Sequence, residues 1–125
     1  MRSSAALAGF ALLTVVLLAL ASRQSTWQPW SVRPNVIRWQ TQSEVDVFAY
    51  DVYRGPSERG PFTPINPQPV LAAGTSDLPQ NYRYVDASIA ADTVYWYFIE
   101  SISFTGQRES LTPVYPSRAK TATLW

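Results

Sequence analysis

The 125-residue chain has no cysteine and no histidine, and each absence excludes a class of chemistry. Without cysteine there is no thiolate nucleophile, no iron–sulfur cluster, no cysteine-bound zinc and no disulfide framework. Without histidine the chain lacks the side chain that most often serves as a general base near neutral pH. The single lysine, Lys120, stands close to the end of the sequence. The sequence therefore predicts a protein that is not an enzyme and that holds no metal or other cofactor.

An excess of charge of either sign is also missing. Ten Lys and Arg residues face nine Asp and Glu residues, for a net charge of +1, which argues against a nucleic-acid partner. Glycine patterns that bind phosphates or dinucleotides are absent as well, so we expect no small-molecule substrate. Aromatic residues are plentiful, with five Trp, seven Tyr and five Phe, and only Phe10 precedes residue 22.

Residues 1–22 form a segment of a different kind from the rest of the chain. Arg2 is followed by the uncharged run AALAGFALLTVVLLALA (5–21), and the stretch from Ser3 to Ser22 would extend about 30 Å as a helix. This length favours a transmembrane anchor in the lipid bilayer. The small residues around Leu20, before Ser22, also fit a signal cleavage site, so a removed secretion signal is the alternative. A lipoprotein is excluded because no cysteine exists to carry the lipid.

Residues 23–34 are predicted to be a polar linker or a first edge strand. Arg23, Trp27 and Trp30 follow the apolar run closely, and we expect them at the membrane interface, where tryptophan is enriched. Ordinary packing on the domain is the alternative for the two tryptophans. At the other end, residues 120–125 are predicted to be a tail, in which Trp125 either frays or anchors in a partner's groove.

The pattern between these ends is that of β-strands. Apolar residues alternate with polar ones over 36–41, 47–54, 81–86 and 93–104, and no segment after residue 22 has a helical period. Glycine marks turns at 55–60 and at 105–106. Six of the ten prolines fall between Pro56 and Pro79, so we expect residues 66–80 to be a loop along the sheet edge. Strands recurring about every ten residues predict an all-β sandwich over residues 35–119. Its core is expected to hold Trp39, Phe48, Tyr50, Tyr84, Tyr95, Tyr97 and Ile99.

Six motifs follow one another in a suggestive order: Trp39, SEVD (43–46), YDVYR (50–54), FTPIN (62–66), YRYVD (82–86) and TVYWYFIESI (93–102). They resemble successive strands of a fibronectin type III domain, in the variety attached to bacterial extracytoplasmic proteins. Tyr95 falls at the tyrosine-corner position of that family, and Gly106 suits its final hairpin. The resemblance covers residues 31–119 and departs at the first strand and at residues 66–80. It implies a sandwich of seven or six strands, located outside the cytoplasm, and no common active site.

Two sets of charged residues are candidate sites. Glu44 and Asp46 are the closest acidic pair and could bind calcium or share acid and base roles, but we expect two solvated loop charges. The arginines lie among acids and are expected to form surface ion pairs; they are Arg54, Arg59, Arg83 and Arg108.

Some aromatic residues do not fit the core. If Tyr95, Tyr97 and Ile99 point inward, alternation turns Trp96, Phe98 and Ile102 outward. Tyr53 on the neighbouring strand points the same way. We therefore predict a partner-binding patch made of Tyr53, Trp96 and Phe98. The alternatives are that the linker or the 66–80 loop covers the patch, or that the register is inverted.

The apolar run predicts a single-pass membrane protein, and the resemblance implies the bacterial inner membrane with the domain in the periplasm. The domain would be an accessory or stabilising subunit of a larger membrane protein complex, for example a photosynthetic or respiratory one. The alternative is a secreted carbohydrate- or surface-binding module that stacks aromatic rings on sugars. A small hydrolase that uses Glu44 and Asp46 is the third hypothesis.

Overall fold

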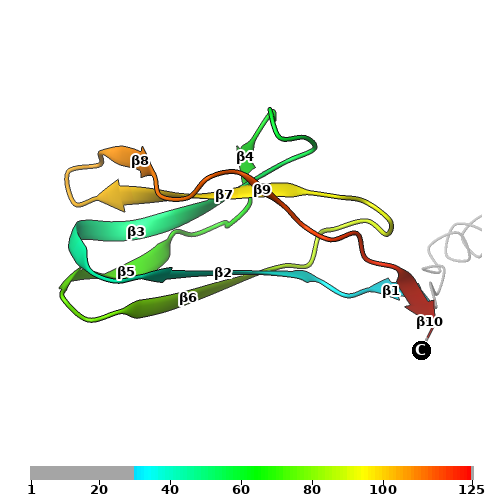
Figure 1. Cartoon of the computed structure of the whole chain (residues 1–125), viewed down its shortest axis with the longest axis horizontal. Helices are drawn as coiled ribbons and strands as arrows, with labels where there is room; N and C mark the ends of the chain where they lie inside the picture. Colours follow the sequence, from blue (N-terminus) through cyan, green and yellow to red (C-terminus); the bar gives the residue numbers. More distant parts are fainter. Residues whose placement is uncertain (1–29, 125) are drawn as a thin grey trace, which may run out of the picture.

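The computed structural model describes residues 30–124, and every regular element in this range is a β-strand. The all-β prediction is therefore confirmed for the described residues (Figure 1). The range holds no helix with the length and apolar character of a membrane span. The predicted anchor or signal in residues 1–22 lies outside the described residues. The strands are β1 (Trp30–Val32), β2 (Asn35–Thr41), β3 (Glu44–Gly55), β4 (Thr63–Pro64), β5 (Val70–Ser76), β6 (Gln80–Asp86), β7 (Trp96–Ser103), β8 (Arg108–Ser110), β9 (Tyr115–Pro116) and β10 (Ala122–Leu124).

Two sheets pack face to face. The smaller sheet is the antiparallel pair β2–β6, in which Trp39 lies opposite Tyr82. The larger sheet is centred on β3 and β7, which pair antiparallel with Tyr53 opposite Phe98. Strands β4 and β5 pair with the remaining edge of β3, while β8 and β9 pair with the remaining edge of β7. Figure 1 shows β2 and β6 as one layer and the larger sheet as the other.

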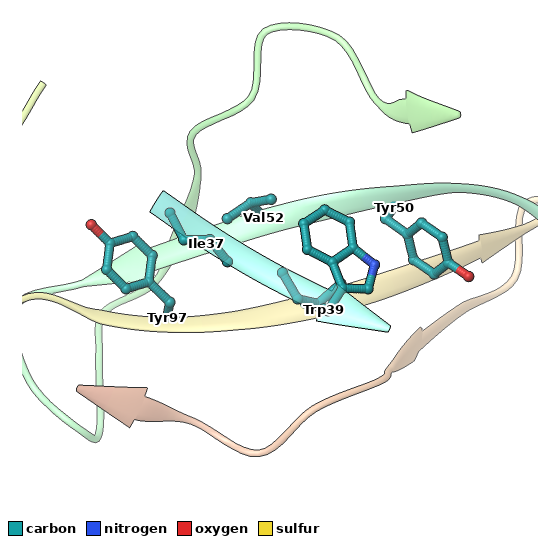
Figure 2. Packing of buried hydrophobic residues seen from close by; sticks show 6 residues of the cluster. Ile37, Trp39, Tyr50, Val52 and Tyr97 are labelled. Carbon is teal, nitrogen blue, oxygen red and sulfur yellow. The ribbon is translucent and has the colours of Figure 1, made fainter. Parts of the chain in front are cut away.

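The core fills the space between these layers. Its most buried members are Ile37 and Trp39 from β2, Tyr50 and Val52 from β3, and Tyr97 and Ile99 from β7. In Figure 2, Ile37 and Trp39 project from β2 toward the side chains of the larger sheet. The Trp39 ring is stacked on Tyr82 at 5.4 Å between centroids and meets Tyr50 edge-on at 5.7 Å.

Most of the predicted core is confirmed. Trp39, Tyr50, Tyr97 and Ile99 are buried, and Tyr84 and Tyr95 are partly buried against them.

Phe48 was expected in the core, and this prediction is wrong. Its side chain is 42% exposed and packs on Phe104 instead. The cause is a shift in the pairing of β3 with both neighbours between Val47 and Ala49. A bulge adds one residue to a strand, so the alternation of faces restarts after it. Phe48 therefore does not share a face of the sheet with Tyr50, as it would in a regular strand.

The predicted loop over residues 66–80 is wrong in part, because Val70–Ser76 form strand β5. This strand pairs with β3 alone and lies at the edge of the larger sheet. Pro67, Pro69 and Pro79 flank the strand and do not interrupt it, so every residue of β5 can donate its backbone N–H. The prolines therefore mark the limits of an edge strand.

The predicted linker and tail also contain strand. β1 pairs antiparallel with β10, so that Trp30 lies opposite Leu124 and Val32 opposite Ala122. Figure 1 shows this short ribbon beyond the end of β2. The edge-strand alternative for residues 23–34 agrees with β1, whereas the sequence showed no sign of the strand in the predicted tail, because that strand is only three residues long.

Candidate functional site

The outer face of the larger sheet carries the predicted partner-binding aromatics. Tyr53 and Phe98 are register partners on β3 and β7, and Trp96 lies opposite Gly55 in the same register. The rings of Tyr53 and Phe98 stack at 4.7 Å between centroids with only 6° between their planes. The structure thus brings Tyr53, Trp96 and Phe98 onto one face, and all three are half-buried.

A fourth aromatic side chain joins this face from the turn after β3. Phe62 meets Phe98 edge-on at 5.1 Å between centroids. Gly55 makes this position possible, since a Cβ at Gly55 would lie 2.8 Å from the Phe62 ring. Phe62 therefore covers part of the patch, whereas the sequence pointed only to the linker and the 66–80 loop as cover. We refer to Tyr53, Phe62, Trp96 and Phe98 as the aromatic face.

A network of charged groups borders the aromatic face. The Tyr53 hydroxyl donates to Glu100 Oε1 at 3.2 Å, and Arg108 donates to the same oxygen at 2.7 Å. Arg108 also reaches across β7 to Asp51 Oδ2 at 2.9 Å. Burial, together with the charge of Glu100, raises the pKa of Tyr53 above its usual value, so its hydroxyl remains a donor. This network joins β3, β7 and β8 along the rim of the face.

Ile102 lies beside the same network and is buried. Alternation places Ile102 on the outer face, as predicted, yet its side chain is only 7% exposed. Its register partner on β8 is Arg108, whose side chain extends over β7 toward Asp51. Because Ile102 is buried, it adds nothing to the accessible part of the aromatic face.

Glu44 was predicted to be a solvated loop charge, and this prediction is wrong. Its side chain is buried, with 2% of the residue exposed. Thr41 and Tyr50 donate hydroxyls to Oε1 at 2.9 and 2.8 Å, Tyr82 donates to the same oxygen, and the Ala73 N–H donates to Oε2 at 2.9 Å. Burial alone would raise the pKa of Glu44, but these hydrogen bonds outweigh it and hold the pKa below the usual 4.5.

The Glu44 carboxylate therefore joins both sheets. Tyr82 belongs to β6 in the smaller sheet, whereas Tyr50 and Ala73 belong to β3 and β5 in the larger one. Asp46, the other member of the acidic pair, is exposed and has a left-handed backbone with φ of 57°. The two carboxylates thus occupy different environments. Sequence reasoning missed this site because Tyr50 and Tyr82 reach Glu44 only in the folded chain.

A second buried carboxylate, Asp86, ends strand β6. Arg54 donates to both of its oxygens, at 3.0 and 2.9 Å, and the Tyr97 hydroxyl donates to Oδ2 at 2.7 Å. Asn35 Nδ2 in turn donates to the Tyr97 hydroxyl at 2.9 Å. Although burial opposes it, hydrogen bonding from Tyr97 and Arg54 lowers the pKa of Asp86 below the usual 3.8. These contacts tie both sheets together, as those of Glu44 do.

The predicted pairing of the arginines is confirmed for two of the four. Arg54 pairs with Asp86 and Arg108 with Asp51 and Glu100. Arg59 and Arg83 make no ion pair with any residue in the range 30–124. Within that range no three acidic side chains gather closely enough to hold a metal ion.

The other predicted contact residues fall mostly beyond the described part of the chain. Arg23, Trp27 and Trp125 lie outside it, and only the backbone of Trp30 is described, as the first residue of β1.

Comparison with protein-family models, with curated proteins and with solved structures finds no match to this chain. A functional proposal therefore rests on the geometry of the described residues and on the sequence.

Proposed function

We propose that this chain is a non-enzymatic, single-pass protein of the bacterial inner membrane. Its periplasmic β-sandwich acts as an accessory or stabilising subunit of a larger membrane protein complex. The observation that carries the proposal is the aromatic face. The outer face of a sandwich sheet normally carries polar residues, yet here Tyr53, Trp96 and Phe98 stand there together.

The attachment would involve two points. The apolar run of residues 5–21 would hold the chain in the bilayer, and the aromatic face would make the contact with the complex. Tethering raises the effective concentration of the domain near its partner, so a contact of modest area suffices.

We further propose that the sandwich is of the fibronectin type III kind. The pairing of β2 with β6, opposite β3 and β7, supports this arrangement. So does a hydrogen bond at 2.9 Å from the Ala90 N–H to the Tyr95 hydroxyl, five residues later. A tyrosine that bonds back to the upstream backbone in this way is the feature called a tyrosine corner.

The geometry favours a protein partner over the carbohydrate alternative. Sugars bind to free faces of aromatic rings, whereas Tyr53 and Phe98 present their faces to each other. The edge of Phe62 occupies a further part of this surface. Binding of a glycan array by the wild-type chain, lost in Trp96→Ala, would instead support the secreted module.

The test is isolation of the untagged full-length chain from its host membrane in mild detergent. We expect a complex larger than the chain itself, which Trp96→Ala dissociates. Phe104→Ala is the matched control, because Phe104 is an exposed aromatic residue just beyond the opposite end of β7. A solitary chain, or equal loss with both variants, would refute the proposal. A mature N-terminus at Ser22 would remove the membrane anchor from it.

A further inference from the structure

One edge of the smaller sheet is open in the part of the chain that the structure describes. Within residues 30–124, β2 pairs with β6 alone, so its other edge has no strand beside it. That edge faces a groove whose opposite wall is β9 and the chain that comes after it. In Figure 1 this segment runs from the larger sheet toward β10. A strand with a free edge presents backbone N–H and C=O groups that can pair with another strand.

The groove encloses a space of about 340 Å³ that is partly open to solvent, and we refer to this space as the cavity. Among its lining residues Ile37 and Tyr97 are buried and Tyr115 is half-buried, and Asn35 and Ser117 supply polar atoms. A strand placed beside β2 would point every second side chain into this space, as β2 itself does with Ile37. The cavity therefore suits small apolar side chains on one face of an added strand.

The groove is bordered by positive charge. Arg38, Arg118 and Lys120 all line it, and in the described part of the chain none of them is within ion-pair distance of an acid. Arg83 lies directly opposite Arg38 on β6 and adds a further cation to the outer face of the sheet. By contrast, Arg54 and Arg108 on the larger sheet are both paired with acids. Three cations without an ion pair among the described residues thus line the groove, and a fourth lies beside it.

We propose that the free edge of β2 binds an extended peptide strand in which acidic and small apolar residues alternate. The backbone of the peptide pairs with β2, its apolar side chains enter the cavity, and its carboxylates face Arg38 and the neighbouring cations. This binding site is separate from the aromatic face and goes beyond the proposed function.

A second copy of the chain does not fit the same edge. Arg38 is the central residue of β2, which runs from Asn35 to Thr41. Two β2 strands paired antiparallel about their centres would place two Arg38 side chains directly opposite each other, close to both Arg83 side chains. Like charges in this position are unfavourable. The charge that repels a second copy is the one that attracts an acidic strand.

The experiment uses the full-length chain in a neutral detergent and a synthetic eight-residue peptide of alternating valine and glutamate. Binding is measured by fluorescence titration, and amide hydrogen exchange is followed along β2. We expect the β2 amides that do not pair with β6 to exchange quickly in the free chain and slowly with the peptide. A peptide with lysine in place of glutamate should not bind. A Val/Glu peptide with every backbone amide methylated should not bind either, because it cannot pair with β2.

Arg38→Glu should weaken binding about tenfold or more, since it turns an attraction into a repulsion. Arg59→Glu is the matched control, because it makes the same change on an exposed arginine in the turn after β3. Equal weakening by the two variants, or equal binding of the methylated peptide, would overturn the proposal in favour of unspecific charge attraction. Protection of all β2 amides in the free chain would also overturn it, because the chain itself would then occupy the edge.

Discussion

Replacement of Glu44 by glutamine tests whether the buried carboxylate holds the two sheets together. Hydrogen bonds to a charged group are worth about 1 kcal/mol more than bonds to a neutral one, and three hydroxyls donate to Oε1. The side-chain amide of glutamine would also face the Ala73 N–H, so that two donors meet, at a further cost of about 1 kcal/mol. We expect Glu44→Gln to lower the free energy of unfolding by about 3 to 4 kcal/mol at pH 7. That is a large part of the roughly 5 to 15 kcal/mol typical of a domain.

The contribution of Glu44 to the free energy of unfolding should also depend on pH. The folded-state pKa of Glu44 lies below the usual 4.5, so its contribution is complete above that pH and is lost as the pH falls through the folded-state value. Glutamine does not titrate. The difference between wild type and Glu44→Gln should therefore be full at pH 7 and shrink below pH 4.5.

Urea unfolding followed by tryptophan fluorescence measures the difference, because Trp39 packs on both Tyr50 and Tyr82. Glu109→Gln is the matched control, since Glu109 is exposed on β8 and should change stability by no more than about 0.5 kcal/mol. Equal stability of the two variants at pH 7 would refute the reasoning. So would a difference that stays the same down to pH 3.

Three further outcomes are expected. Trp39→Ala should lower the free energy of unfolding by about 3 to 5 kcal/mol in denaturant titration. Phe48→Ala should cost less than about 1.5 kcal/mol, because Phe48 is 42% exposed. Similar losses in the two variants would contradict the bulge in β3. Burial and the Asp86 carboxylate raise the pKa of Tyr97 above its usual 10.0, so the contribution of Tyr97 to the free energy of unfolding is complete below pH 10 and declines at higher pH. In Tyr97→Phe the free energy of unfolding, measured from pH 8 to 12, should therefore depend less on pH than in the wild type. Gly55→Ala should displace Phe62 and cost about 1 to 3 kcal/mol, seen as a lower Tm and altered NMR shifts of the aromatic face; unchanged shifts would show that the ring does not depend on this glycine.

The aromatic face shows how far alternation alone can locate a site. Trp96 and Phe98 could be assigned to the outer face because β7 is regular, so parity counted from Tyr97 and Ile99 holds along its length. Tyr53 followed from the same count on β3, on the regular side of the bulge. Phe62 could not be assigned, because it reaches the face from a turn, where side-chain direction has no period.

The sequence by itself determined the all-β class, most of the core and the face on which the aromatics stand. Each of these depends on local alternation, which a strand imposes on neighbouring residues whatever surrounds it. Only the tertiary structure decided that Phe48 leaves the core, that Glu44 is buried and that, among residues 30–124, β2 has an unpaired edge. Each of those depends on which strands become neighbours: the bulge on the pairing of β3, the hydrogen bonds of Glu44 on β5 and β6, and the free edge on the pairing of β2 with β6 alone among the described residues. Contacts between residues distant in the chain have no period from which they could be read.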